Sequence, residues 1–218
     1  MEHTRRSVLT GLAAAGVVGT AGCLGGDEEA RIDGSEFDCS ITEPTDVDLD
    51  YRPVLGDPDA SVVVQVFEDF TCGHCATYKL DHFPTIHEQY IDTNEIRYEH
   101  WDFPIPVDEE WAVPIASAAR GVGAREGSDA FRAFTSAVYE SHGNYDEQAI
   151  VDAADAAGVD PCAALSDAAY SAYEEALMAD RDEGESMGVG GTPTVFVDGT
   201  AVDGYDSSTV SAAIDDAL

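Results

Sequence analysis

Two cysteines separated by two residues, Cys72 and Cys75, are the part of this chain best suited to chemistry. They follow the apolar, β-branched run Ser61–Phe67, which is typical of a strand buried on both faces of a sheet, and they begin a helical pattern. Two thiols at this spacing can cycle between a dithiol and a disulfide. The sequence therefore predicts a redox site where a strand meets a helix.

The two cysteines are expected to have different roles. A helix N-terminus carries unpaired N–H groups and partial positive charge, so Cys72 should ionise more readily than a free cysteine, whose pKa is about 8.5. Cys75, one turn into the helix, can attack a mixed disulfide at Cys72 and release the bound partner. His74 adds a titratable positive charge beside the thiolate. Because a stabilised thiolate favours the reduced form, the disulfide form should be an oxidant.

Half of a zinc site and a plain structural disulfide are the alternatives for this motif. A closed zinc site needs a second ligand pair at compact spacing. Cys39 and Cys162 are isolated, and no H-x3-H pair exists among the remaining candidates His82, His87, His100 and His142. We expect no metal, and no cofactor beyond the Cys72–Cys75 disulfide. A metal-binding module that uses Cys72, His74 and Cys75 remains the alternative from another class.

A second motif, GGTPTVFVDG at Gly190–Gly199, joins a glycine-rich approach, a proline and a short apolar strand. With this motif the chain resembles the DsbA-like branch of the thioredoxin superfamily, over a region from about Ser61 to Leu218. The resemblance implies an α/β thioredoxin fold with a helical insertion, and thiol-disulfide oxidoreductase activity. It also implies a cis Thr192–Pro193 bond that faces the cysteines.

Thr192 and Pro193 are assigned to the edge that meets substrate. Pro193 has no N–H and cannot pair there, whereas the backbone of Thr192 can hydrogen-bond an extended substrate as an added strand. The alternative is an ordinary proline at the start of a strand.

The chain departs from the family pattern at two places. Thioredoxins often carry a buried acid six residues before the first cysteine, but that position is Val66 here, and the nearest carboxylates are Glu68 and Asp69. Asp69 matches an aspartate common in the DsbA-like branch. Gly73 replaces a frequent proline, which gives a CGHC tetrad like that of protein disulfide isomerases and makes Gly73 a second candidate for tuning the thiolate. Oxidase, reductase and isomerase activity therefore all stay open.

The first residues predict export. Thr4–Leu9 resembles a twin-arginine signal, and the apolar stretch Val8–Gly22 is too short to span a bilayer. Thr20–Cys23 resembles a lipobox, in which Cys23 would receive lipid; a non-lipidated signal cut nearby is the alternative, because Thr20 replaces the usual leucine. We expect a signal peptide over 1–22, an acidic tether over 23–59 and a thioredoxin-like domain over 60–218.

Composition indicates a salt-adapted protein. The formal net charge is -34, from 44 acidic and 10 basic residues, and Lys79 is the only lysine. The acids are scattered through amphipathic patterns, which is typical of a folded halophile-like chain. Nucleic acid is excluded as an expected partner because nothing basic could neutralise its phosphates. The expected partners are cysteine-containing exported proteins, a membrane or soluble redox partner that resets the pair, and the membrane surface through an N-terminal lipid.

Within the domain, hydrophobic periodicity predicts the remaining elements. A helix from Cys75 to about Ile91, kinked near Pro84, and a strand over Ile96–Trp101 complete a βαβ unit. Helical periods between about Glu109 and Glu185 predict an inserted helical region at about 105–186. An Asp198–Gly199 turn and a last helix after Ser207 follow. Cys39 and Cys162 either form a second disulfide or stay separate.

Overall fold

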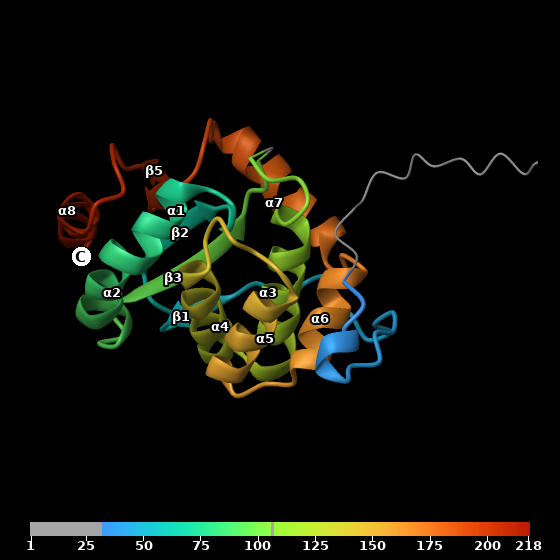
Figure 1. Cartoon of the computed structure of the whole chain (residues 1–218). Coiled ribbons are helices and arrows are strands. Elements are labelled where there is room, and N and C mark those ends of the chain that lie inside the picture. Colours follow the sequence, from blue (N-terminus) through green and yellow to red (C-terminus); the bar gives the residue numbers. More distant parts are fainter. Residues whose placement is uncertain (1–31, 106) are drawn as a thin grey trace, which may run out of the picture.

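The computed structural model describes residues 32–105 and 107–218. Its centre is a five-stranded sheet in the order β1-β3-β2-β4-β5 (Figure 1). The strands are β1 (Val54–Gly56), β2 (Val62–Glu68), β3 (Ile96–Asp102), β4 (Thr194–Val197) and β5 (Thr200–Ala201). β2 and β3 are parallel, and the other neighbouring pairs are antiparallel. The expected βαβ unit and the hairpin at Asp198–Gly199 are therefore confirmed.

Consecutive helical segments join β2 to β3, and the backbone dihedral angles stay in the right-handed helical region from one segment to the next. They are α1 (Gly73–Thr77), the π-helical η2 (Tyr78–His82), α2 (Phe83–Ile86) and the π-helical η3 (His87–Ile91). The π-helical turns lie on either side of Pro84, which has no N–H to donate to the helix. The expected irregularity at Pro84 is thus present, and the helix begins at Gly73, two residues earlier than expected.

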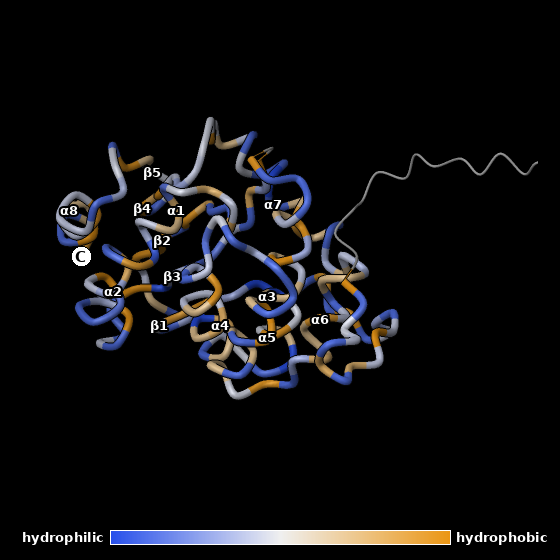
Figure 2. Tube along the Cα trace, in the orientation of Figure 1, coloured by the Kyte–Doolittle hydropathy of each residue, from blue (hydrophilic) through white to orange (hydrophobic). Residues whose placement is uncertain are grey.

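The expected helical insertion consists of five helices between β3 and β4. They are α3 (Ala112–Glu126), α4 (Ser128–Glu140), α5 (Glu147–Ala157), α6 (Pro161–Ala169) and α7 (Glu174–Met187). The chain then ends in α8 (Ser207–Ala217). In Figure 2 the insertion helices carry both hydrophobic and hydrophilic residues, as helices with one buried side do.

Three apolar clusters hold these parts together. One lies between the sheet, the helix after β2 and α8, and includes Val64, Tyr78 and Ile214. A small cluster around Phe67 joins β2 to β4 and to the segments that follow β3 and α7. The third fills the helical insertion and also includes Cys72 and Cys75. The two cysteines therefore lie where the helical insertion meets the sheet domain.

The acidic tether expected over 23–59 does not extend over residues 32–59 in the structure. The side chain of Ile32 is buried, β1 pairs with β3, and the short 3-10 helix η1 (Ser35–Phe37) lies against the insertion. Cys39 and Cys162 form a disulfide with a Cα–Cα distance of 5.2 Å, which answers the question left open by their sequence positions. Residues 32–59 are thus part of the folded domain.

The expected export signal and the expected lipid site at Cys23 lie outside the described residues. Over residues 32–105 and 107–218, no helix has the length and apolar character needed to cross a membrane.

Candidate active site

Cys72 and Cys75 lie at the start of α1, directly after the end of β2. Cys72 is the N-cap residue, with an extended backbone, and its carbonyl accepts a hydrogen bond from the N–H of Ala76. The side chain of Cys72 is 6% exposed and that of Cys75 is fully buried. Both are free thiols in the structure. The outer cysteine alone can be reached by a reaction partner.

The surroundings separate the acidities of the two thiols. A hydrogen bond from the Cys75 thiol is the main cause that lowers the pKa of Cys72, to about 5, against the opposing effect of burial. The backbone N–H groups of Cys75 and His74 lower it further. Burial raises the pKa of Cys75 well above its usual value, and its hydrogen bond to Cys72 and the charge of Glu68 add to this. At neutral pH the site can thus present a thiolate at Cys72 and keep Cys75 as a thiol.

The Gly-Thr-Pro segment reaches the cysteines from a distant part of the chain. The thiol of Cys72 donates a hydrogen bond to the carbonyl oxygen of Thr192 at 3.3 Å. The Thr192–Pro193 peptide bond is cis, as the resemblance implies. The carbonyl favours the thiol form of Cys72, while the N–H groups of α1 favour the thiolate. Because the pKa of Cys72 is lowered, the groups that favour the thiolate have the larger effect. The structure therefore brings Cys72, Thr192 and Pro193 together.

The two residues between the cysteines have separate surroundings. The ring of His74 is exposed, and its Nδ1 atom lies 2.8 Å from the hydroxyl of Tyr205. In this arrangement His74 acts on Cys72 through its backbone N–H. A Cβ atom at Gly73 would lie 3.6 Å from Cε1 of His142, an ordinary contact distance. Thiolate tuning by the His74 ring and by Gly73 stays a prediction.

Asp69 holds the turn between β2 and α1. Its carboxylate accepts hydrogen bonds from the backbone N–H and the hydroxyl of Thr71, and one from the N–H of Ile105 at 2.6 Å. Burial raises the pKa of Asp69 and outweighs these hydrogen bonds. Asp69 therefore connects the turn that precedes Cys72 to the segment that follows β3.

Three side chains from the helical insertion bind the same loop, a role that was not predicted for them from the sequence. The hydroxyls of Tyr139 and Tyr145 donate to the carbonyls of Asp69 and Phe70, at 3.3 and 2.7 Å. Nε2 of His142 donates to the carbonyl of Thr71 at 3.0 Å. The even spacing of these polar aromatic residues, Tyr-x-x-His-x-x-Tyr, was the available signal. The insertion thus fixes the backbone that precedes Cys72.

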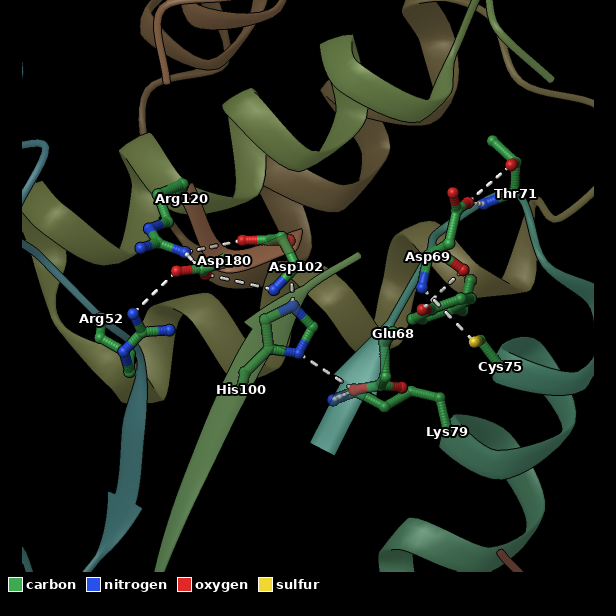
Figure 3. Close-up of polar contacts among 11 residues, drawn as sticks. Arg52, Glu68, Asp69, Thr71, Cys75, Lys79, His100, Asp102, Arg120 and Asp180 are labelled. Carbon is green, nitrogen blue, oxygen red and sulfur yellow. Dashed lines mark hydrogen bonds and ion pairs between the residues drawn. The ribbon is translucent and has the colours of Figure 1, made fainter. Parts of the chain in front are cut away.

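A buried group of charged residues lies behind Cys75 (Figure 3) and was also missed. Its members come from six separate parts of the chain: Arg52, Glu68, Lys79, His100, Asp102, Arg120 and Asp180. In the part of the chain that the structure describes, no group of three or more His, Cys, Asp or Glu side chains is arranged to hold a metal ion.

Comparisons with known proteins agree with this architecture. The chain is 29% identical to a putative protein-disulfide oxidoreductase of Rickettsia bellii over 171 residues, which cover 76% of this chain and 64% of that protein. It is 27% identical to a probable disulfide bond formation protein D of Bacillus anthracis over 172 residues, covering 75% of this chain and 77% of the relative. The chain thus spans under two thirds of the length of the Rickettsia relative.

Solved structures show the same fold. The oxidised BdbD structure from Bacillus subtilis superposes with a TM-score of 0.68 at 21% identity, covering 82% of this chain and 97% of that one. The thiol-disulfide exchange protein α-DsbA2 of Wolbachia pipientis gives a TM-score of 0.65 at 24% identity, covering 77% and 87%. A sequence model of the family described as Thioredoxin matches residues 48–216, well over half of the chain. The protein therefore belongs to the thioredoxin family.

Proposed function

We propose that this protein is an extracytoplasmic thiol-disulfide oxidoreductase that introduces disulfides into exported proteins. The observation that carries the proposal is the position of Cys72 at the N-cap of α1 and against the Thr192 carbonyl, with Cys75 fully buried one turn further on. These surroundings lower the pKa of Cys72 and raise that of Cys75. The names of the Rickettsia and Bacillus relatives, which refer to protein-disulfide oxidoreduction and disulfide bond formation, support it.

The reaction proceeds by two exchanges at Cys72. A substrate thiolate attacks the Cys72 sulfur of the Cys72–Cys75 disulfide, and Cys75 leaves and takes up a proton. A second thiolate of the substrate then attacks the substrate sulfur that is bonded to Cys72. A disulfide forms within the substrate, and Cys72 leaves as a thiolate. The substrate loses two electrons and the protein gains them. Because a thiol of low pKa is a good leaving group, the pKa of about 5 at Cys72 favours this direction.

Thr192 and Pro193 form the edge that receives the substrate in this proposal. The Thr192 carbonyl lies against Cys72, so an extended substrate backbone bound beside it brings a cysteine to the reactive sulfur. A membrane-bound or soluble redox partner then restores the Cys72–Cys75 disulfide.

The proposed location rests on the N-terminal sequence. The twin-arginine pattern at Thr4–Leu9 and the lipobox-like Thr20–Cys23 support export and a lipid anchor on Cys23 at the outer face of the cell membrane. The Cys39–Cys162 disulfide fits an oxidising location outside the cytosol. The acidic composition supports a salt-rich environment for the organism.

The decisive experiment is the reduction potential of the Cys72–Cys75 pair, measured by equilibration with glutathione buffers. An oxidase should have a potential less negative than about -170 mV, between those of protein disulfide isomerase and DsbA. A value near -270 mV, like that of thioredoxin, would instead indicate a reductase.

The CGHC tetrad favours one second candidate, disulfide isomerisation, because Gly73 and His74 match the tetrad of protein disulfide isomerases. A potential near -180 mV, together with recovery of activity from a scrambled disulfide substrate, would support it. Stoichiometric zinc in protein purified without oxygen would support the metal-binding alternative at Cys72, His74 and Cys75.

A further inference from the structure

The loop between β5 and α8 carries Tyr205, whose hydroxyl contacts the helix that begins at the redox pair. Nδ1 of His74 lies 2.8 Å from this hydroxyl, although the two residues are 131 positions apart. The ring centroids of His74 and Tyr205 are 5.9 Å apart. The ring of His82, in η2, lies 6.0 Å from the Tyr205 ring. A single tyrosine thus contacts two histidines of the helical segments that follow Cys72.

The neighbouring structure holds Tyr205 in place. Its side chain is partly buried and packs against the apolar cluster between the sheet, the helix after β2 and α8. The next residue, Asp206, is the N-cap of α8 and accepts hydrogen bonds from the backbone N–H and the hydroxyl of Thr209, at 3.1 and 2.6 Å. The residue before it, Gly204, has a φ of 131°, which only glycine adopts readily. The Tyr205 hydroxyl is therefore a fixed point.

The ring of His74 is exposed and starts close to the reactive sulfur. Cys72 is the N-cap of α1 and His74 is the second residue of the helix, so the Cys72 sulfur lies near the N–H of His74. Within the described chain, the His74 ring makes its one hydrogen bond with Tyr205. Other staggered rotamers of a free His74 side chain would bring the imidazole towards that sulfur. There a protonated ring would favour the thiolate through its charge, and a neutral ring through its N–H.

Other groups stabilise the Cys72 thiolate in the structure. The Cys75 thiol has the largest effect, and the backbone N–H groups of Cys75 and His74 add to it. The Cys72 sulfur itself lies 3.3 Å from the carbonyl oxygen of Thr192. The backbone of His74 thus acts on Cys72 while the ring of the same residue is bound to Tyr205.

We propose that Tyr205 is a positioning residue of the redox site, which holds the His74 ring away from Cys72 and so limits how strongly the Cys72 thiolate is stabilised. A tyrosine hydroxyl can accept a hydrogen bond from a protonated ring nitrogen or donate one to an unprotonated nitrogen. The contact therefore persists when the ring gains or loses a proton. In this way the loop before α8 sets the oxidising strength of the cysteine pair.

This assignment rests on the proposed function, because the oxidising strength of the pair follows from the stability of the Cys72 thiolate. A more stable thiolate favours the dithiol form and makes the disulfide a stronger oxidant. No bond to Tyr205 or His74 forms or breaks during thiol-disulfide exchange. The two residues act only on the equilibrium between the dithiol and the disulfide.

A double-mutant cycle on the full chain tests the assignment. Tyr205→Phe removes the hydroxyl and keeps the ring that packs against the apolar cluster. His74→Gln removes the imidazole, and a third protein carries both changes. His82→Gln is the matched control, because His82 also contacts Tyr205 ring to ring but lies in η2, beyond α1. The pKa of Cys72 is measured in each reduced protein from the rate of alkylation against pH.

Tyr205→Phe should lower the pKa of Cys72 by about one unit, the lower end of the effect of a neighbouring positive charge. His74→Gln should hardly change this pKa, because the ring is already held on Tyr205, and the double variant should match His74→Gln. The reduction potential of Tyr205→Phe at pH 6 should be less negative than that of the wild type by about 30 mV, a ten-fold change in the equilibrium with glutathione. His82→Gln should match the wild type in both measurements.

An unchanged pKa of Cys72 in Tyr205→Phe would overturn the proposal. The same decrease in the double variant would also overturn it, since a purely structural effect of Tyr205 does not need His74. A large rise of the pKa in His74→Gln alone would show that the ring already acts on Cys72, with the same consequence. Alkylation needs no substrate, so these results are independent of the wild-type potential. A wild-type potential near about -270 mV would count against the proposed function instead.

A further measurement uses the unmodified protein and does not depend on a variant folding. The NMR chemical shifts of the His74 ring nitrogens are compared between the reduced and the oxidised protein. A ring held on Tyr205 should give nearly the same shifts in both states, whereas in Tyr205→Phe the shifts should change when Cys72 becomes a thiolate. A large change in the wild-type protein on reduction would overturn the assignment.

Discussion

The sulfur of Cys72 lies 3.3 Å from the carbonyl oxygen of Thr192, although the two residues are 120 positions apart. This contact joins the start of α1 to the loop before β4. It places a backbone acceptor, and beside it a proline that cannot donate, against the reactive sulfur. The proposed substrate edge therefore lies directly beside the reactive sulfur of the redox pair.

Replacing Pro193 with Ala should slow turnover of a cysteine-containing peptide while leaving the Cys72–Cys75 disulfide able to form. The variant gains an N–H and backbone freedom beside Cys72, which loosens the edge without changing the thiols. We expect a loss of about ten-fold, measured as peptide oxidation per turnover, since small misplacements at a reacting centre have effects of this size. Pro161→Ala, at the start of α6, is the control. Unchanged turnover in Pro193→Ala would indicate an ordinary proline at a strand start.

Alkylation of the reduced protein across pH should reveal a thiolate at Cys72 with a pKa of about 5, and almost no reaction at Cys75 below pH 9. Mass analysis of each labelled cysteine makes the measurement. Cys75→Ala should raise the pKa of Cys72, because the Cys75 thiol is the main cause of its depression. Equal labelling of both cysteines at every pH would contradict the assignment of roles.

The same shift makes the stability of the reduced protein depend on pH. The folded pKa of Cys72 lies well below that of a free cysteine, so this thiolate stabilises the folded reduced state fully above pH 9. The contribution declines as pH falls and is lost as pH passes through about 5. The urea midpoint of the reduced protein, minus that of reduced Cys72→Ala, should therefore grow between pH 5 and pH 9. A difference in urea midpoint that does not change with pH would show that Cys72 has the same pKa in the folded and unfolded states.

Replacing Cys75 with Ser should trap mixed disulfides between Cys72 and cysteine-containing proteins, because no thiol remains to release them. Cys72→Ser should trap far fewer, since Cys75 is fully buried. Non-reducing gels of the exported fraction, probed for this protein, compare the two variants. Equal trapping would mean that the nucleophile is misassigned.

Removing the Cys39–Cys162 disulfide by a double change to Ser should lower the free energy of unfolding by about 2–4 kcal/mol, as the bridge closes a long loop. Urea unfolding of the oxidised protein measures the loss. Hydrogen exchange should also quicken at β1, which lies in the segment that the bridge ties down. Peptide oxidation at low temperature serves as the control and should be retained. An unchanged unfolding free energy would show that packing alone holds residues 32–59.

Molar potassium chloride should raise the thermal midpoint of the domain. The net charge of -34 concentrates repulsion in the folded state, and at 1 M salt the screening length is about 3 Å. Circular dichroism at low and at molar salt tests this. The buried pairs around Arg120 are shielded from salt, so the shift should be the same in Asp180→Asn as in the wild-type protein. A thermal midpoint that does not change with salt concentration would weaken the halophile interpretation.

The sequence predicted those parts of the fold and site that depend on local pattern. The run Val62–Phe67 before Cys72 identifies a strand, and helical periods identify the insertion. The Gly-Thr-Pro motif predicted the loop opposite Cys72, because this motif and the Cys-x-x-Cys motif occur together in one known family. In each case a few adjacent residues carry the information.

Other features depend on contacts between distant residues and left no local signal. β1 is only Val54–Gly56, held by pairing with β3, so no periodicity marks it. Residues 23–59 look like a tether in composition, yet packing and the Cys39–Cys162 bridge fold their later part onto the insertion. Arg120 lies in the middle of an alanine-rich helix, and only the tertiary structure gives it Asp102 and Asp180 as partners.

If Cys23 carries the proposed lipid, the position of Ile32 in the fold limits how far the enzyme can reach from the membrane. The N–H groups of Asp33 and Gly34 are held by Glu147 at 2.8 and 3.2 Å, so this part of the chain lies beside α5. Nine peptide units separate Ile32 from Cys23, the proposed lipid site, and they span about 30 Å at full extension. With so short a tether, the enzyme would work within roughly one molecular diameter of the membrane. It would meet proteins as they emerge from export, before they diffuse away.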